Sequence, residues 1–180
     1  VLLTNSGTIT TSSSGSVDTT NRNDYILFGT TQGLLHVVDA TTGQEKFAFV
    51  PNEMVTKQKN AFLKNDSTTA FNPTTHDNLF YGVDGPWSVY SEYVPKADGS
   101  LTVGAGLGGA TGQQLAYGGL RMGGKSYYAL DLSDIQNPKL KFHINPDAID
   151  ASQPLKRMGQ SWSKPTLAYV NWGGAKKLVM

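Results

Sequence analysis

The segment Gly119–Ser126, GLRMGGKS, matches the phosphate-loop pattern G-x-x-x-x-G-K-[ST]. In a working phosphate loop, backbone N–H groups and a helix N-terminus hold the phosphates, the lysine supplies charge, and the serine or threonine binds magnesium. This mechanism requires a helix directly after the lysine. After Lys125 the sequence has adjacent aromatic residues, alternating stretches and Pro138, which predict a strand and then a turn. We therefore interpret the segment as a Gly-rich hairpin connection and expect no nucleotide to bind there.

A second glycine pattern lies upstream of the first. Gly104, Gly106 and Gly109 reproduce the spacing G-x-G-x-x-G of dinucleotide-binding loops. That fingerprint lies between a strand and a helix, and an acidic residue on the next strand completes it. The residues that follow, ATGQQLAYGG, are interrupted by glycines and predict no helix. We interpret the pattern as a loop between strands and expect no cofactor-binding residue in it.

The three histidines, His36, His76 and His143, share no metal-ligand spacing. His36 and His143 occupy strand-like positions, which indicates packing or solvent exposure. The sequence contains no calcium loop of the D-x-[DN]-x-[DN]-G type, and no Ser–His–Asp order indicates a nucleophile. We predict no catalytic, cofactor-binding or metal-binding residue in this chain.

Three aromatic residues, Trp87, Tyr90 and Tyr93, flank a turn and a strand. Large aromatic side chains are often buried, and here they could pack between strands. If they are exposed, they could instead anchor a protein partner. They are the candidate partner-contact residues of this chain.

The composition excludes several classes of partner. The 180 residues include 15 Lys and Arg against 14 Asp and Glu, a formal net charge of +1, which gives no general attraction to nucleic acid. The chain has no cysteine and therefore neither a disulfide nor a thiolate metal site. No apolar run approaches the roughly 18 residues of a membrane helix, so we expect no membrane insertion. We interpret the loose clusters of cations as solvated surface: Lys57, Lys59, Lys64, Lys156, Arg157, Lys176 and Lys177.

The elements that must position these residues form an internal repeat. Residues 25–51 read as three strands joined by two turns, and residues 115–146 repeat the same plan. Asp39 and Asp131 are the matched carboxylates at the strand ends, and their separation equals about two periods of a propeller blade of roughly 40–45 residues. We expect residues 80–103 to supply the blade between them. The pattern predicts an all-β fold, a partial β-propeller of about three to four blades.

The chain divides into two regions. Residues 1–23 are rich in Ser, Thr and Gly, which predicts a linker or edge segment. Residues 24–180 form the predicted partial propeller, with one short helix inserted near Asn52. The chain starts at Val1 without a methionine and stops within a strand-like stretch, so we expect it to be a piece of a longer protein.

Several residues are assigned structural roles in the strands and turns of the predicted blades. Glycines are expected where a sharp turn needs a positive φ, and Asp with Gly is typical of turns. The assigned positions are Gly33, His36, Asp39, Thr42, Gly43, Phe47, Asp84, Gly85, Gly118, Gly119, Gly123, Gly124 and Asp131.

An ordered series of motifs resembles the C-terminal propeller of the PilY/PilC family. The series is GLLHVVDATTG, then YGVDGPWSV, then GGLRMGGKSYYALD, and finally WSKPTLAYV, and the resemblance runs from about Asn23 to Met180. These are large exported bacterial proteins associated with the tips of type IV pili. The resemblance implies a non-enzymatic pilus-tip adhesin and biogenesis factor that opposes pilus retraction, with pilins, minor pilins and host or abiotic surfaces as partners. It also implies an exported location at the cell surface.

The family's propeller is similar to quinoprotein propellers, whose blades carry the motif D-x-x-T-G-x-x-x-W. Asp39, Thr42 and Gly43 fit this motif, and Phe47 stands at the tryptophan position. A piece of a pyrroloquinoline-quinone-dependent dehydrogenase is therefore the alternative interpretation, against which Phe47 counts. The family also binds calcium through an Asp-rich loop that is not among these residues, so calcium is implied for the longer protein only. The loops at 52–78 and 98–114 are long for strand connections, and we expect them to carry contacts.

Overall fold

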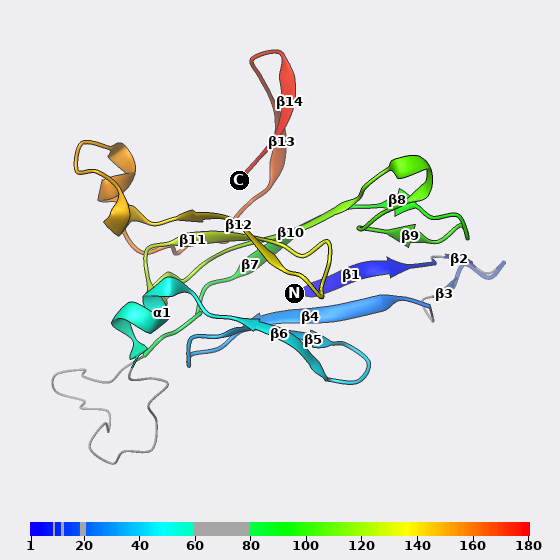
Figure 1. Cartoon of the computed structure of the whole chain (residues 1–180), viewed down its shortest axis with the longest axis horizontal. Coiled ribbons are helices and arrows are strands. Elements are labelled where there is room, and N and C mark those ends of the chain that lie inside the picture. Colours follow the sequence, from blue (N-terminus) through cyan, green and yellow to red (C-terminus); the bar gives the residue numbers. More distant parts are fainter. Residues whose placement is uncertain (9, 12, 19–20, 60–79) are drawn as a thin grey trace.

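The computed structural model describes residues 1–8, 10–11, 13–18, 21–59 and 80–180. Figure 1 shows two sheets that lie as two layers, with the short helix α1 (Asn52–Lys57) at one end. Among these residues, the predictions of an all-β fold and of one short helix are confirmed. The strands of the described residues form no closed ring, and the number of blades stays a prediction.

The first sheet has the strand order β6-β5-β4-β1-β9-β8 and is antiparallel throughout. A separate pair, β2 with β3, follows β1 along the chain. The strands are β1 (Leu2–Gly7), β2 (Thr10–Thr11), β3 (Val17–Asp18), β4 (Asn23–Gly29), β5 (Leu35–Asp39), β6 (Glu45–Phe49), β8 (Val94–Pro95) and β9 (Leu101–Thr102).

The second sheet is a four-stranded antiparallel meander with the order β12-β11-β10-β7. A two-stranded hairpin, β13 with β14, follows it and projects away from both layers in Figure 1. The strands are β7 (Trp87–Glu92), β10 (Gln113–Gly119), β11 (Tyr127–Asp131), β12 (Lys139–Ile144), β13 (Ala168–Trp172) and β14 (Ala175–Val179). Short 3₁₀ turns lie in their connections, at η3 (Leu107–Gly109), η4 (Arg121–Gly123), η5 (Pro146–Ala148) and η6 (Pro154–Arg157).

The internal repeat predicted from the sequence is present in the two sheets. Strands β4, β5 and β6 form one meander, and β10, β11 and β12 form another. The register shifts between Val37 and Val38 in the first meander and between Ala129 and Leu130 in the second. Each shift lies directly before the matched aspartate, Asp39 in the first meander and Asp131 in the second. A β-bulge therefore occupies the same position in both copies.

The separate sheet expected for residues 80–103 does not form. Strand β7 pairs with β10 in the second sheet, whereas β8 and β9 pair with each other and with β1 in the first. A strand-like composition predicts extended backbone but does not identify the partner strand, which depends on the faces that become buried. Residues 80–103 therefore connect the two sheets and do not form a blade of their own.

The prediction that residues 1–23 form a linker or edge segment is wrong for residues 2–7. These residues form β1, which pairs with β4 on one side and with β9 on the other. The Asn5 amide nitrogen donates to Gln114 Oε1 and to the Leu132 carbonyl, each at 3.1 Å. The polar side chains that suggested a solvated segment therefore satisfy hydrogen bonds between the sheets.

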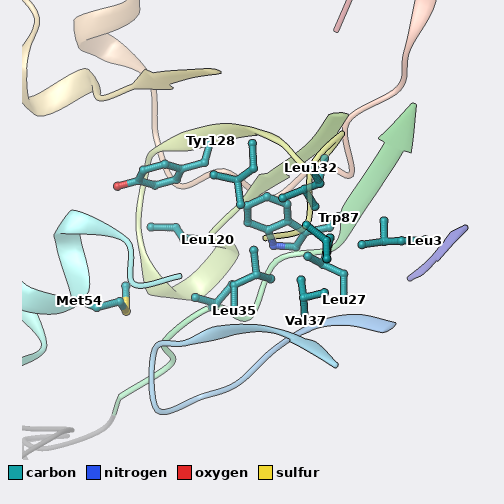
Figure 2. Close-up of a cluster of buried hydrophobic side chains, with 13 residues drawn as sticks. Leu3, Leu27, Leu35, Val37, Met54, Trp87, Leu120, Tyr128 and Leu132 are labelled. Carbon is teal, nitrogen blue, oxygen red and sulfur yellow. The ribbon is translucent and has the colours of Figure 1, made fainter. Parts of the chain in front are cut away.

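The core lies between the two layers, as Figure 2 shows. Leu27, Leu35 and Val37 of the first sheet face Trp87 and side chains of the second, and all of them are buried. Met54 of α1 closes one end of this cluster. Such interlocked apolar burial is the main favourable term in the stability of the fold. The remaining buried members are Leu3, Val83, Ala116, Leu120, Tyr128, Leu130, Leu132 and Ile135.

We expect Leu3→Ala to lower the free energy of unfolding by about 3 kcal/mol, because it removes a fully buried side chain and leaves a cavity between the sheets. Leu2→Ala is the matched control, since Leu2 is 56% exposed on the opposite face of the same strand. Urea denaturation of both variants measures the difference. Equal stability of the two variants would contradict the assignment of β1 to the core.

Candidate contact surface

The segment that matches the phosphate-loop pattern joins β10 to β11. Gly119 pairs with Tyr127 at the end of the hairpin, so the predicted hairpin connection is confirmed. Strand β11 begins directly after Ser126, at the place where a phosphate loop has its helix. Lys125 Nζ lies 3.5 Å from Asp147 Oδ1, and the Ser126 side chain is buried. Both functional side chains of the pattern therefore have protein partners.

Two glycines of this region are required by close approach. A Cβ atom on Gly118 would lie 2.1 Å from the Trp87 ring, and a Cβ atom on Gly123 would lie 1.7 Å from the Gly82 carbonyl oxygen. Real side chains do not tolerate such distances. The glycines therefore allow the β10–β11 connection to pack directly on residues 82–87.

The turn between β5 and β6 is built around Asp39. Its carboxylate Oδ1 accepts hydrogen bonds from the Thr41 and Thr42 backbone N–H groups, both at 3.0 Å. Gly43 has a φ of 72°, which a glycine adopts without strain. Gly33 lies in the preceding turn, between β4 and β5. These residues shape the two hairpin turns of the first meander.

We expect the pKa of Asp39 to lie below its ordinary value of 3.8, because the Thr42 and then the Thr41 backbone N–H groups stabilise the carboxylate. A lowered folded-state pKa means that the carboxylate stabilises the fold above 3.8 and that this contribution is lost as the pH falls through the folded-state pKa. Carboxyl-detected NMR titration of the folded chain measures the value. A midpoint at or above 3.8 would refute this account of the turn.

The remaining motif residues of the first meander have packing roles. His36 Nδ1 lies 2.5 Å from Glu45 Oε2, and the ring stacks on Phe28 with centroids 5.2 Å apart. Phe47, at the tryptophan position of the quinoprotein motif, packs against the main core cluster. Phe47 also lines a pocket of about 140 Å³, whose one charged lining residue is Lys139.

The matched residues of the second meander are equally structural. Asp131 accepts from the Ser133 backbone N–H at 3.1 Å and from its hydroxyl at 2.6 Å, so it shapes the turn after β11. Asp84 Oδ2 lies 3.6 Å from an Arg121 guanidinium nitrogen. The glycines Gly85, Gly119 and Gly124 lie in the two segments that pack against each other there.

The three candidate contact aromatics differ in exposure. Trp87 is only 4% exposed and lies in the core, so it cannot anchor a partner. The Tyr90 hydroxyl contacts the Tyr169 hydroxyl, and this hydrogen bond together with burial raises the pKa of Tyr90. Tyr93 is 39% exposed, and its hydroxyl donates to the Thr4 carbonyl at 2.7 Å. Of the three, Tyr93 is the one available to a partner.

Tyr93 lines the edge of a pocket of about 230 Å³ between β1 and the β8–β9 strands. The pocket wall is chiefly apolar, with one cationic side chain. Arg22 Nη2 donates to Thr4 Oγ1 at 2.6 Å and to Asp24 Oδ1 at 3.0 Å, which fixes the guanidinium. An aromatic ring beside an ordered arginine is typical of protein contact sites. The lining residues are Thr4, Gly7, Arg22, Tyr93 and Leu101.

The two loops expected to carry contacts are only partly described. Of residues 52–78, those from 60 onward lie outside the described residues. The 98–114 loop contributes Leu101 to the pocket and exposes Leu107 at 59%. The pocket therefore brings together Tyr93 and the 98–114 loop, which the sequence analysis predicted separately as contact positions.

A buried polar cluster at α1 was missed in the sequence analysis. The Glu53 side chain is 7% exposed and accepts hydrogen bonds from the Ser126 and Tyr128 hydroxyl groups. His143 Nε2 lies 3.1 Å from Ser126 Oγ and 3.5 Å from Glu53 Oε1. The His143 ring also stacks on Tyr128, with centroids 4.2 Å apart. A glutamate in a short helix one residue before a core methionine was the signal available in the sequence.

This cluster contains the residue types of a hydrolase but not their arrangement. In a catalytic triad the histidine contacts the serine through one ring nitrogen and the carboxylate through the other. Here Ser126 and Glu53 share the same nitrogen of His143, and the Ser126 hydroxyl is 1% exposed and donates to Glu53. Burial and then the hydrogen bond to Glu53 raise the pKa of Tyr128, which keeps its hydroxyl protonated. The cluster attaches α1 to the second sheet.

Within the described ranges, no three His, Asp or Glu side chains come together in a way that could hold a metal ion. Among the same residues no helix is long and apolar enough to span a membrane.

The sequence is similar to known pilus proteins, although no protein-family model matches it. It is 31% identical over 148 residues to the type IV pilus biogenesis factor PilY1 of Pseudomonas aeruginosa, a match that covers 82% of this chain and 10% of that protein. It is 28% identical over 153 residues to the PilY1 homolog of Xylella fastidiosa, covering 85% of this chain and 10% of that protein. The chain thus spans about a tenth of the length of these curated relatives.

The fold is also similar to that of a PilY1 protein. The crystal structure of the Pseudomonas aeruginosa PilY1 C-terminal domain matches with a TM-score of 0.52 and 28% sequence identity. This match covers 86% of the present chain and 24% of that one. The resemblance to the PilY/PilC family is confirmed by both comparisons, and the chain is a homologue of one segment of the PilY1 C-terminal domain.

Proposed function

We propose that this chain is part of a type IV pilus biogenesis factor and that it acts as a rigid platform for contacts. The observation that carries the proposal is the 31% identity to a type IV pilus biogenesis factor over 82% of the chain. The match to a solved C-terminal domain supports it, because the shared fold covers 86% of the chain. The protein is exported and lies at the cell surface with the pilus, where it opposes retraction and attaches to surfaces.

The architecture of the proposed factor is a β-propeller to which this chain contributes blades. Two antiparallel meanders with a bulge at the same position support this, since repeated sheets are the units of a propeller. The solved relative is about four times as long as the matched region, which leaves room for further sheets. Calcium binding in the full protein belongs, in this proposal, to residues outside the described ranges.

The proposed role is contact and not catalysis. The Ser126 hydroxyl is buried and donates to a carboxylate, which supports a structural role for the cluster of Glu53, Ser126 and His143. The partners are pilins or minor pilins and surface ligands. Among the described residues, the Tyr93 pocket offers an ordered arginine and an exposed aromatic ring to such partners.

Deletion of the gene in the source bacterium tests the pilus role. We expect the deletion strain to lose its surface pili, counted by electron microscopy. Pili should return when the retraction motor is removed as well, because assembly then proceeds without opposition. Normal pili and normal surface attachment in the deletion strain would exclude the role, and quinone binding by the purified protein would then be measured.

Substitution of the Tyr93 pocket tests the contact site separately. We expect Tyr93→Ala with Leu101→Ala to reduce surface attachment while pili remain, since the pair removes the exposed aromatic ring and one apolar wall. Leu140→Ala is the control, because Leu140 is 55% exposed on the other sheet. Equal attachment by the two strains, with equal protein levels, would exclude the pocket as the contact site.

A further inference from the structure

The Gly-rich β10–β11 connection contains a strained residue. Arg121 has a φ of 50° and is the one non-glycine residue with a positive φ in the described part of the chain. An L-residue with a long side chain avoids this conformation, which glycine adopts freely. Strained backbone persists where the surroundings fix it, and it concentrates at functional positions. An arginine in a connection already rich in glycine therefore requires an explanation.

The surroundings that fix Arg121 come from the segment around Ser161. Ser161 is 2% exposed, and its hydroxyl accepts from the Leu120 N–H at 2.7 Å and donates to the Gly124 carbonyl at 3.2 Å. The Arg121 N–H donates to the Ser161 carbonyl at 3.3 Å, and the Ser161 N–H donates to the Gly124 carbonyl at 3.1 Å. Four hydrogen bonds to one buried serine thus hold both sides of the connection.

This rigid base presents two large side chains to solvent. The Arg121 guanidinium carbon lies 5.6 Å from the centroid of the Trp162 ring, at the distance of a cation–π contact. The Arg121 side chain is 48% exposed and Trp162 is 51% exposed. Arginine and tryptophan are the residue types most enriched among energetically dominant interface positions. Because their backbone is already fixed, a partner that binds them loses little conformational entropy.

The two segments that carry the pair are basic, and the neighbouring carboxylates come from other segments: Asp84 beside Arg121 and Asp147 beside Lys125. The two segments that build this surface, residues 113–128 and 151–164, contain no Asp or Glu. The acidic group next to the pair is Asp84, 3.6 Å from Arg121, a distance at which an incoming carboxylate could compete for the guanidinium. The cations of the two segments are Arg121, Lys125, Lys156, Arg157 and Lys164.

We propose that Arg121 and Trp162 form a docking site for an acidic segment of a protein partner. The positive charge selects an acidic ligand, the guanidinium can bind a carboxylate in two-point geometry, and the indole ring packs against an apolar neighbour of that carboxylate. Single-stranded nucleic acid fits less well, since such sites stack successive bases on several aromatic rings, and this pair offers one ring. The proposal rests on this surface alone and does not depend on the pilus role.

A peptide-display selection tests the proposal. The protein is immobilised, and a phage library of random peptides is selected on it after depletion on the Arg121→Gly variant. We expect the selected peptides to be enriched in Asp and Glu next to aromatic or proline residues. Synthetic copies should bind the Arg121→Gly and Trp162→Ala variants at least about tenfold more weakly than the parent. Arg121→Gly should keep or raise the melting temperature, because glycine relieves the positive φ.

Matched controls come from the β13–β14 hairpin, which carries a similar pair. Lys176 Nζ lies 4.4 Å from the centroid of the Tyr169 ring, and Trp172 is 70% exposed. Trp172→Ala and Lys176→Ala should leave peptide affinity unchanged. Three results would overturn the proposal: no acidic enrichment, equal peptide binding by the Trp162→Ala variant, or tighter Trp162-dependent binding of oligo-dT or heparin than of any selected peptide.

Discussion

Gly123→Ala is expected to destabilise the fold by about 3 kcal/mol or more, because the new methyl group cannot be placed without moving backbone. Its Cβ atom would lie 1.7 Å from the Gly82 carbonyl oxygen. Gln58 bridges the same two backbone segments. Its side-chain amide nitrogen donates to the Gly123 carbonyl at 2.8 Å, and its amide oxygen accepts from the Gly82 N–H at 3.1 Å. Two backbone segments and α1 must therefore separate together. Chemical denaturation followed by circular dichroism measures the loss.

Gly159→Ala is the control for this substitution. A Cβ atom on Gly159 would have no heavy atom within 4 Å beyond its chain neighbours, and its φ is not positive. Alanine should therefore change the free energy of unfolding by less than about 0.5 kcal/mol. If Gly123→Ala is as stable as Gly159→Ala, the close packing of the two connections does not exist in solution.

Glu53→Ala is the second substitution with a large expected effect, a loss of about 3 kcal/mol. The carboxylate accepts from the Ser126 and Tyr128 hydroxyl groups, and His143 Nε2 lies 3.5 Å from it. Tyr128 is 2% exposed, so its buried hydroxyl would lose the carboxylate that accepts its hydrogen bond. Glu53→Gln keeps an acceptor oxygen and should lose only about 1 kcal/mol.

A second Glu–His pair in the same chain provides the control. Glu45 is 51% exposed and lies 2.5 Å from His36, so its replacement by alanine should lower stability by less than about 1 kcal/mol. Thermal unfolding of the three variants under one set of conditions gives the comparison. A loss for Glu45→Ala that equals that for Glu53→Ala would show that burial does not determine the contribution of these pairs.

The all-β class and the repeat of three strands could be predicted because they depend on local pattern. Alternating side chains and glycine turns define each strand of the two meanders, and Asp39 and Asp131 align them. The strand pairing of residues 80–103 could not be predicted, because strand partners are determined by contacts between residues distant in sequence. The Gly118–Trp87 contact that accompanies the β7–β10 pairing is one of these, and no local pattern encodes it.

The candidate site was predicted in part. Tyr93 was identified from its type, but its exposure was left open, and Trp87 was named beside it although the core buries it. The pocket arises because β9 reaches β1 across many intervening residues. Glu53 was not identified because a charged residue in a short helix is usually solvated. Its burial depends on three partners distant in sequence: Ser126 in the β10–β11 connection, Tyr128 in β11 and His143 in β12.

The pairing of β1 with β9 has a consequence for how the protein forms as it is synthesised. Ser6 pairs with Thr102, so the first sheet stays incomplete until the ribosome has passed residue 102. By then β7 (Trp87–Glu92) has been synthesised, whereas its own partner β10 begins only at Gln113. The chain therefore moves from one layer to the other and back before either layer is finished. The two layers become stable as one unit, and a nascent chain that ends between them presents open strand edges to chaperones.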